Sequence, residues 1–399
     1  MEKVRYLILG AGPAGLALAN LIRKNRPEAS FLVLEKEKVP GGLCRSETVD
    51  DAPLDIGGGH FLDVRRPRVN EFLFSFMPEE EWDRYERDSR IELKGQVIGS
   101  PIEANIWMLD TDSQVEYLKA IAEAGCVSGK PMPEKFTEWI YWKLGKRIAE
   151  DYMIPYNKKM FGEELDSLGT YWLEKLPDVS FEDTLRSCLT HKAYAKQPGH
   201  AEFFYPKKYG YGELWLRIAE SLGDRLKTGV AARSLDIKEK TVNDEFKADI
   251  IINTVPWTAF ETIKGADDKI TDGIKTLKHS SIVTEYFSEN MDTEAHWIYY
   301  PEEDKDYHRI LVRHNFCPGS KGYWTETNLT RYKESSREHF INEYAYPLNT
   351  IGKNETMTEL LSEMKRHNII GLGRWGEWQH FNSDVVVERA LKLAEELGA

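Results

Sequence analysis

A glycine-rich turn between two apolar runs, within the first 46 residues, is the feature that most constrains the fold. A strand-like apolar run leads into Gly10, Gly12 and Gly15, which have the spacing G-x-G-x-x-G, and a helical pattern follows. A second apolar run, Phe31–Leu34, then ends in Glu35. This order predicts a Rossmann-type βαβ unit that binds a dinucleotide, because such a unit consists of a strand, a glycine turn, a helix and a second strand that ends in an acidic residue.

Each residue of the turn has a distinct expected role. Gly10 permits the tight turn, Gly12 lets a pyrophosphate approach the backbone, and Gly15 lets helix and strand pack closely. The pyrophosphate would rest on the amides at the positive end of the helix. Glu35 lies where a carboxylate accepts hydrogen bonds from an adenosine ribose. The expected contacts of the dinucleotide are Gly10, Gly12, Pro13, Ala14, Gly15, Glu35 and Lys36.

Composition limits the class of protein. A chain of 399 residues fits two or three domains. A net charge of −13 argues against nucleic acid as the main partner, while leaving room for an anionic small substrate in a locally basic cleft. We expect a cytoplasmic protein, because the chain enters a strand without an apolar leader and no run is long enough to span a bilayer. The scattered cysteines predict free thiols and no metal site.

Further glycine-rich segments indicate close backbone approaches to a second part of the cofactor. Gly42, Leu43 and Arg45 form the first, and Gly58, Gly59 and His60 form the second. Arg45 is expected to donate to phosphate or ribityl oxygens, with a surface ion pair as the alternative.

Apolar spacing predicts the domain organisation. Residues 1–70, 201–270 and 365–399 are expected to form a discontinuous Rossmann-like α/β domain, since strand patterns near 250–255 and 369–371 return to the first sheet. Residues 71–200 are predicted to be a mainly helical insert. Residues 280–315 alternate apolar and polar side chains, and residues 271–364 are therefore expected to form a substrate domain with an antiparallel sheet.

Five segments together resemble the flavoprotein superfamily of amine oxidases, protoporphyrinogen oxidase and UDP-galactopyranose mutase, and most closely the mutases. They are Gly-Gly-Leu-Cys-Arg-Ser at 41–46, Gly-Gly-His at 58–60, Pro-Tyr-Asn-Lys-Lys-Met-Phe-Gly at 155–162, Tyr-His-Arg-Ile at 307–310 with Asn-Phe at 315–316, and Gly-Arg-Trp-Gly-Glu-Trp at 373–378 with Asp-Val at 384–385. The resemblance implies FAD as cofactor. It adds Gly42, Leu43, Arg45, Gly58, Gly59, His60, Val230, Gly373, Arg374, Asp384 and Val385 to the residues expected to bind it.

The resemblance also implies a nucleotide-sugar substrate. Its expected contacts are Tyr156, Phe161, Tyr209, Arg309, Asn315, Tyr346 and His380, with Arg309 on the diphosphate. His60 and Arg309 are the expected catalytic residues. The alternatives are an ion pair of Arg309 with Asp304 or Asp306, a helix-end role for Arg374, and core packing for His60 and the aromatic residues.

Two functions follow from this resemblance. The first is a pyranose/furanose mutase, an isomerase in which N5 of reduced flavin attacks the anomeric carbon, with NAD(P)H as a possible reductant and a possible homodimer. The second is an FAD-dependent oxidoreductase of the amine oxidase type. The chain departs from the mutases in two places: neither 176–180 nor 203–206 holds their second diphosphate arginine, and His380 stands where a tyrosine is expected. Lys207 and Lys208 could supply charge but lack the guanidinium fork.

Overall fold

A mainly parallel sheet built from distant stretches of the chain forms the first structural unit. The computed structural model describes residues 1–173, 179–194 and 201–398. Within these residues the sheet has eight strands, in the order β10-β2-β1-β13-β12-β11-β14, with β20 paired to β13. Their bounds are β1 Glu2–Leu9, β2 Phe31–Glu35, β10 Leu226–Thr228, β11 Ser234–Asp236, β12 Thr241–Val242, β13 Phe246–Asn253, β14 Thr262–Lys264 and β20 Ile369–Gly371.

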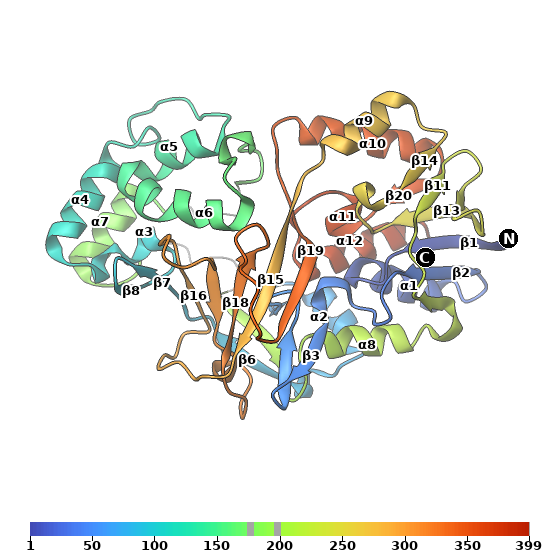
Figure 1. The fold of residues 1–399 in the computed structure, drawn as a ribbon, viewed down its shortest axis with the longest axis horizontal. Helices are drawn as coiled ribbons and strands as arrows, with labels where there is room; N and C mark the ends of the chain where they lie inside the picture. Colours follow the sequence, from blue (N-terminus) through green and yellow to red (C-terminus); the bar gives the residue numbers. More distant parts are fainter. Residues whose placement is uncertain (174–178, 195–200, 399) are drawn as a thin grey trace.

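Side chains alternate along β1 to serve a separate core on each face of this sheet. Tyr6 and Ile8 join the core that includes helices α1, Pro13–Asn25, and α12, Ser383–Glu396. Leu7 and Leu9 join the core on the other face, with α9, Asp268–Thr276, and α10, Lys353–Arg366. A sheet covered on both faces explains why its central strands are continuous apolar runs. The discontinuous α/β fold expected from the sequence is confirmed (Figure 1).

A second, largely antiparallel sheet lies beside the first unit (Figure 1). Among the described residues it has seven strands, in the order β19-β15-β18-β17-β16-β7-β8, and only β16 and β7 pair in parallel. The bounds are β7 Ser89–Leu93, β8 Gln96–Gly99, β15 His279–Phe287, β16 Trp297–Tyr299, β17 Arg309–Leu311, β18 Tyr323–Asn328 and β19 His339–Pro347. Smaller sheets join β3 Ser46–Val49 to β4 Ala52–Asp55, and β5 Leu62–Asp63 to β9 Glu202–Pro206 and β6 Trp82–Glu86.

The helices of the insert form the lobe at the left of Figure 1. They are α3 Ile102–Asn105, α4 Thr111–Ala122, α5 Phe136–Ile148, α6 Ile154–Phe161 and α7 Phe181–Thr190. The segment that precedes them differs from the helical prediction for 71–200, because residues 82–99 form β6, β7 and β8. β6 pairs with β9 and β7 pairs with β16, whose residues lie far away in the sequence, and the short β8 pairs with β7, so local periodicity gave little sign of these strands.

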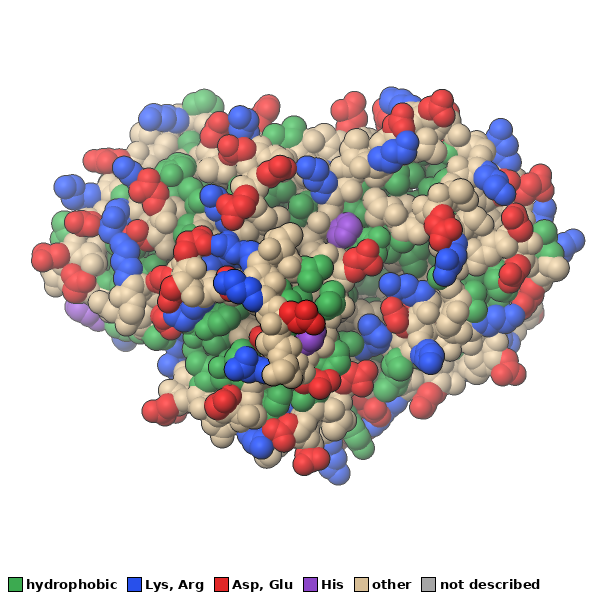
Figure 2. Space-filling view, in the orientation of Figure 1, with side chains coloured by type: hydrophobic (Ala, Val, Ile, Leu, Met, Phe, Trp, Pro, Cys, Tyr) green, Lys and Arg blue, Asp and Glu red, His purple; other side chains and the backbone are tan. Residues whose placement is uncertain are grey.

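The remaining helices are α2 Pro67–Phe74, α8 Gly212–Glu220 and α11 Gly373–Gly376. All four cysteines are free. In the described part of the chain, no helix has the length and apolar character needed to cross a membrane, and no cluster of residues is suited to hold a metal ion. Figure 2 shows acidic and basic side chains interspersed over one face of the molecule.

Candidate functional site

The glycine turn after β1 leaves an open approach to the start of α1. Gly10 has φ +97°, and a Cβ on Gly15 would lie 2.0 Å from the Gly10 carbonyl oxygen, so both positions need glycine. Gly12 is different, because a Cβ there would meet nothing closer than the Gly42 Cα at 3.9 Å. Pro13 is the first residue of the helix. The turn therefore leaves room beside Gly12 for a group that approaches the helix amides.

Glu35 lies at the end of β2 and is almost fully buried. Its Oε2 accepts a hydrogen bond from the Ala11 amide at 2.7 Å, and its Oε1 accepts one from the Glu37 amide at 2.9 Å. The amide of Val230 donates to the Glu35 carbonyl at 2.8 Å. These bonds fix the carboxylate beside the glycine turn. The side chain of Lys36, in contrast, is exposed and pairs with Glu37.

The glycine segment at Gly41 and Gly42 packs directly on the Gly10–Gly15 turn. Gly42 has φ +57°, and a Cβ there would lie 3.2 Å from the Gly12 Cα. The Gly41 amide donates to the Ala11 carbonyl at 2.8 Å. Arg45 donates through Nε to the Gly42 carbonyl at 3.0 Å, rather than forming the surface ion pair considered above. Leu43 lies against Gly57, where an added Cβ would come within 2.0 Å of the Leu43 carbonyl oxygen.

The C-terminal segment closes the same region. Gly373 has φ +79°, and a Cβ there would lie 2.8 Å from the Ala14 Cβ at the start of α1. Arg374 donates to the carbonyls of Phe381 at 2.9 Å and Ala345 at 2.8 Å. Burial, the largest cause, lowers the pKa of its guanidinium. Arg374 is therefore a partly buried cation held by backbone carbonyls, not a helix-end charge in solvent.

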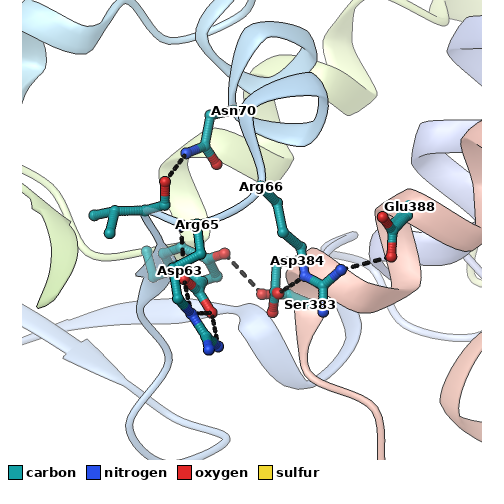
Figure 3. A network of polar contacts seen from close by, with 9 residues as sticks. Asp63, Arg65, Arg66, Asn70, Ser383, Asp384 and Glu388 are labelled. Carbon is teal, nitrogen blue, oxygen red and sulfur yellow. Dashed lines mark hydrogen bonds and ion pairs between the residues drawn. The ribbon is translucent and has the colours of Figure 1, made fainter. Parts of the chain in front are cut away.

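Asp384 belongs to a polar network that ties α2 to α12 (Figure 3). Its buried carboxylate accepts a 2.5 Å hydrogen bond from Arg66, which also pairs with Glu388. The neighbouring Ser383 hydroxyl forms a 2.8 Å hydrogen bond with the Tyr211 hydroxyl. One carboxylate oxygen of Asp384 is engaged in this way, and the amides of Asp384 and Val385 lie in the first turn of α12, where helix amides have no intrahelical partner.

His60 follows the Gly58–Gly59 turn and is neutral. Its Nδ1 lies 2.9 Å from the Gly58 carbonyl oxygen, which can only accept, so Nδ1 carries the proton and Nε2 is left as an acceptor. Burial is the main cause that lowers the pKa of His60 to about 3, and the Arg374 charge adds to it. The ring stacks on Tyr211 at a centroid distance of 6.3 Å.

Arg309, on β17, forms an ion pair with Glu326 of β18. Its Nη2 lies 2.8 Å from the Glu326 Oε2, and the Glu326 side chain is fully buried. The other carboxylate oxygen accepts a hydrogen bond from the Gly59 amide at 3.1 Å. Glu326 therefore joins the expected diphosphate arginine to the glycine turn that carries His60. Asp304 and Asp306, the partners considered from sequence, pair with Lys305 and Lys333 instead.

Aromatic side chains gather near Arg309 and Arg374. The centroid of the Tyr346 ring lies 4.9 Å from the His380 ring centroid and 6.3 Å from the Phe161 ring centroid. The guanidinium carbon of Arg374 lies 5.9 Å from the same Tyr346 centroid. The Tyr156 ring packs at 5.4 Å against Tyr299. Burial raises the pKa of both Tyr156 and Tyr346, so both phenols remain protonated donors.

Two of the expected substrate residues lie apart from this group. Tyr209 is exposed, with the Arg217 guanidinium over its ring. Asn315 donates both amide hydrogens to the carbonyls of Thr293 and Ala295, so it anchors a loop. Lys207 and Lys208 are exposed, and Lys207 bonds the Glu80 carbonyl. Residues 176–178, one place where a second diphosphate arginine was sought, lie outside the described residues.

Sequence reasoning missed three residues that the structure places here: Tyr299, His308 and Glu326. Each lies on or next to a strand of the second sheet, and Glu326 is a fully buried carboxylate within Tyr323–Asn328. The available signal was Glu326 itself, an acidic residue inside a strand. A buried charge needs a partner, so a carboxylate at such a position indicates a nearby cation.

Comparisons with known proteins agree with this architecture. Residues 8–76 match the family model of an NAD(P)-binding Rossmann-like domain. The chain is 23% identical to a probable UDP-galactopyranose mutase of Klebsiella pneumoniae, over 99% of this chain and 95% of that protein. Its fold superposes on reduced UDP-galactopyranose mutase with a TM-score of 0.88 and 21% identity, covering 100% of this chain and 94% of the other.

A more distant fold neighbour is a putative protoporphyrinogen oxidase from Exiguobacterium sp. 255-15. The TM-score is 0.73 with 14% identity, covering 99% of this chain and 98% of that one. A Rossmann-like unit closed by the C-terminal segment, next to an antiparallel sheet and a helical insert, is thus shared with known proteins along the whole chain. The chain has the fold of UDP-galactopyranose mutase.

Proposed function

We propose that this protein is an FAD-dependent nucleotide-sugar pyranose/furanose mutase, similar to UDP-galactopyranose mutase. The observation that carries the proposal is the partly buried Arg309 guanidinium, whose side chain is 22% exposed and which pairs with the fully buried Glu326 beside the Gly58–His60 turn. Its Nε has no hydrogen-bond partner among the described residues, so a donor remains for an anionic group. A planar guanidinium suits a diphosphate, and Arg374 supplies a second, partly buried positive charge next to Tyr346.

The residues around the glycine turns fit FAD. The space beside Gly12 and the amides at the start of α1 suit the pyrophosphate, and Glu35 suits the adenosine ribose. The contact of Gly373 with Ala14 brings the C-terminal segment to the same region, as a cofactor longer than NAD requires. When bound in its reduced form, FAD would supply the nucleophile for the anomeric carbon of the sugar.

The residues of this chain would bind and orient the sugar nucleotide. Arg309 would neutralise the diphosphate, and Tyr156 and Tyr346 would donate hydrogen bonds from phenols that stay protonated. His60 would present Nε2 as a neutral acceptor at any pH above about 3. Because a ring with so low a pKa is a weak base, we expect His60 to orient a hydrogen-bond donor rather than to transfer protons repeatedly.

A direct test is conversion of the sugar ring. The purified protein, reduced with dithionite, is incubated with UDP-galactopyranose, and the products are separated by chromatography. Furanose product that forms with the reduced protein and not with the oxidised protein supports the proposal, and NAD(P)H is then tested in place of dithionite. A preparation that remains colourless after incubation with excess FAD contradicts it.

An amine oxidase-type oxidoreductase is the second candidate. The aromatic group of Tyr156, Phe161 and Tyr346 favours it, since such rings can enclose an amine. The positive charges of Arg309 and Arg374 oppose it, because both repel an ammonium group. Stoichiometric oxidation of an amine with no sugar isomer formed would establish this function instead.

A matched pair of substitutions tests the role of Arg309. Arg309→Lys keeps the charge opposite Glu326 but loses the fork, so we expect roughly 10- to 100-fold weaker binding of UDP-galactose with flavin retained. Arg366→Lys, on the exposed surface of α10, is the control and leaves binding unchanged. Equal affinity of the two variants for UDP-galactose, measured by calorimetry, removes Arg309 from the substrate site.

A further inference from the structure

A fully buried histidine faces the Arg309–Glu326 ion pair. His308 immediately precedes Arg309, and both His308 and Glu326 have side chains with 0% exposure. The His308 Nε2 lies 3.7 Å from the Glu326 Oε2, the same oxygen that lies 2.8 Å from the Arg309 Nη2. One carboxylate oxygen therefore has a permanent cation on one side and a titratable ring on the other.

The His308 ring has no hydrogen bond within the described part of the chain, at either nitrogen. Buried polar atoms normally have a partner, so this ring stands out. At 3.7 Å its Nε2 is too far from Glu326 for a hydrogen bond, yet a protonated ring at this distance would form an ion pair.

The charged groups around His308 explain why it is neutral in the unliganded protein. From β17 it is next to Arg309, and from α6 it faces Lys159 and the Tyr156 ring, whose centroid lies 5.9 Å away. Burial, with the two positive charges, lowers the pKa of His308 well below its usual value. Glu326 is the anion that faces it, and the acidic loop Glu302–Asp304 lies beyond Lys159.

A diphosphate bound at Arg309 changes this balance. Without ligand, the positive charge of Arg309 and the negative charge of Glu326 cancel. An added anion would share Arg309 with Glu326 and place two negative groups in a poorly hydrated region, which strongly favours protonation nearby. Among the described residues, His308 is the neutral base within 4 Å of the Glu326 carboxylate.

We propose that binding of an anionic nucleotide sugar at Arg309 is coupled to the uptake of one proton from solvent by His308, whose ring faces the Glu326 carboxylate. His308 is then a positioning residue: once protonated, it holds Glu326 while Arg309 turns its donors toward the ligand. This inference rests on the proposed function, because it requires an anion at Arg309. It adds a pH dependence that the sequence resemblance does not imply.

Calorimetry measures such proton uptake directly. UDP-galactose is the probe, because its diphosphate is esterified at both ends and does not titrate near neutral pH. Titrations of the flavin-loaded protein at pH 5.5, 6.5 and 7.5 are repeated in buffers with different enthalpies of ionisation. We expect the observed heat to vary with the buffer, in the direction of proton uptake and approaching one proton per ligand at one of these pH values.

Two variants separate this role from a structural one. His308→Asn keeps a polar side chain but cannot titrate in this range, so we expect the proton uptake to disappear and the affinity to become independent of pH. His367→Gln is the control, because His367 pairs with Glu363 on α10, outside the site. If His308→Asn does not fold, the wild-type protein alone still decides: its affinity should fall as pH rises, approaching tenfold per pH unit.

The outcomes distinguish this inference from the proposed function. Binding of UDP-galactose without a buffer-dependent heat at any of the three pH values overturns the proton coupling and leaves the proposed function standing. Uptake that persists in His308→Asn assigns the proton elsewhere and also overturns it. Absence of any binding at every pH overturns the proposed function, and the inference falls with it.

Discussion

At the scale of single residues, glycines in one short turn have different reasons to be there. Gly15 is required by the protein itself, since any Cβ would collide with the Gly10 carbonyl oxygen. Gly12 has φ −80° and ordinary contacts, so the protein alone would tolerate alanine. The structure therefore separates a glycine that the fold requires from one that the fold alone does not require.

Alanine substitutions at the two positions test this distinction. Gly12→Ala should fold with an unchanged Tm of the apoprotein but bind FAD at least about tenfold more weakly, because the methyl group occupies the space beside the helix amides. Gly15→Ala should lower the Tm of the apoprotein, because a 2.0 Å contact forces α1 away from the turn. Flavin absorbance and thermal melting measure the two effects. Full flavin affinity in Gly12→Ala would show that no phosphate lies there.

The buried carboxyl of Asp55, just before the Gly58–His60 turn, gives a prediction on how stability depends on pH. Asp55 has no exposure, and burial raises its pKa to about 7 although Ser46 and Tyr211 donate to it. Between its ordinary pKa of 3.8 and about 7, the folded protein holds a proton that the unfolded chain has lost. This group therefore costs stability as pH rises, by at most roughly 1.4 kcal/mol per pH unit.

Asp55→Asn keeps the acceptor oxygen and removes the titration. We expect the Tm of the variant, relative to wild type, to rise from pH 4 to pH 7 and then to level off. Thermal melts of the apoproteins across this range measure it. A difference in Tm that does not change with pH would show that Asp55 is not protonated in the folded protein.

Part of the candidate site could be predicted from the sequence. The glycine spacing and Glu35 are local patterns with a direct geometric reason, and the structure brings them together. Glu326 and His308 could not be placed in this way, because their roles depend on which strands pair. Arg309 and Glu326 are partners through the register of β17 and β18, and no local pattern gives that register.

At the scale of elements, one lysine joins the helix that carries Tyr156 to the hairpin that carries Arg309. Lys159 of α6 is fully buried, and its Nζ donates to the carbonyls of Tyr300, Glu302 and Tyr307 in the β16–β17 loop. Burial lowers its pKa to about 8. The ammonium group thus links the helix to the loop, and fixes the spacing of Tyr156 and Arg309.

Lys159→Met should separate these elements. It removes the donor to the carbonyls of Tyr300 and Tyr307, while the Glu302 carbonyl keeps the Lys305 amide at 3.4 Å, so we expect a loss of about 2 kcal/mol or more in unfolding free energy and faster amide exchange in the β16–β17 loop. Lys158→Met, one residue earlier and paired with Glu163 at the surface, is the control and should change neither. Exchange rates in the loop that are equal in the two variants would rule out this link.

Helices and strands could be predicted where the elements they pack on are close in the sequence or where their apolar spacing continues over many residues. The segments around α1, β13 and β20 lie where the sequence pattern predicted them. The strands β6 to β8 were missed because each is short, and β6 and β7 pair with distant residues while β8 pairs with β7 alone.

At the scale of the whole molecule, the first domain depends on both ends of the chain. β20 pairs with β13, Gly373 packs on Ala14, and α12 lies against α1 in a shared core (Figure 1). A chain that ends at residue 368 lacks all three contacts. We expect it to be aggregated or unfolded and to bind no FAD, whereas a chain that ends at Leu397 should behave as wild type.

Size-exclusion chromatography and flavin absorbance of the two truncated proteins measure this. A soluble, yellow protein ending at residue 368 would contradict the dependence, because it would mean that the first 368 residues can form the cofactor site without β20 and α12.

The contact between α1 and α12 also orders events during synthesis. The apolar face of α1 emerges from the ribosome early, while α12, which covers it, is translated much later. Throughout elongation the nascent chain must carry this uncovered surface, which is the kind of surface that chaperones bind and that drives association. Production of this protein should therefore respond more to chaperone supply and growth temperature than its finished stability suggests.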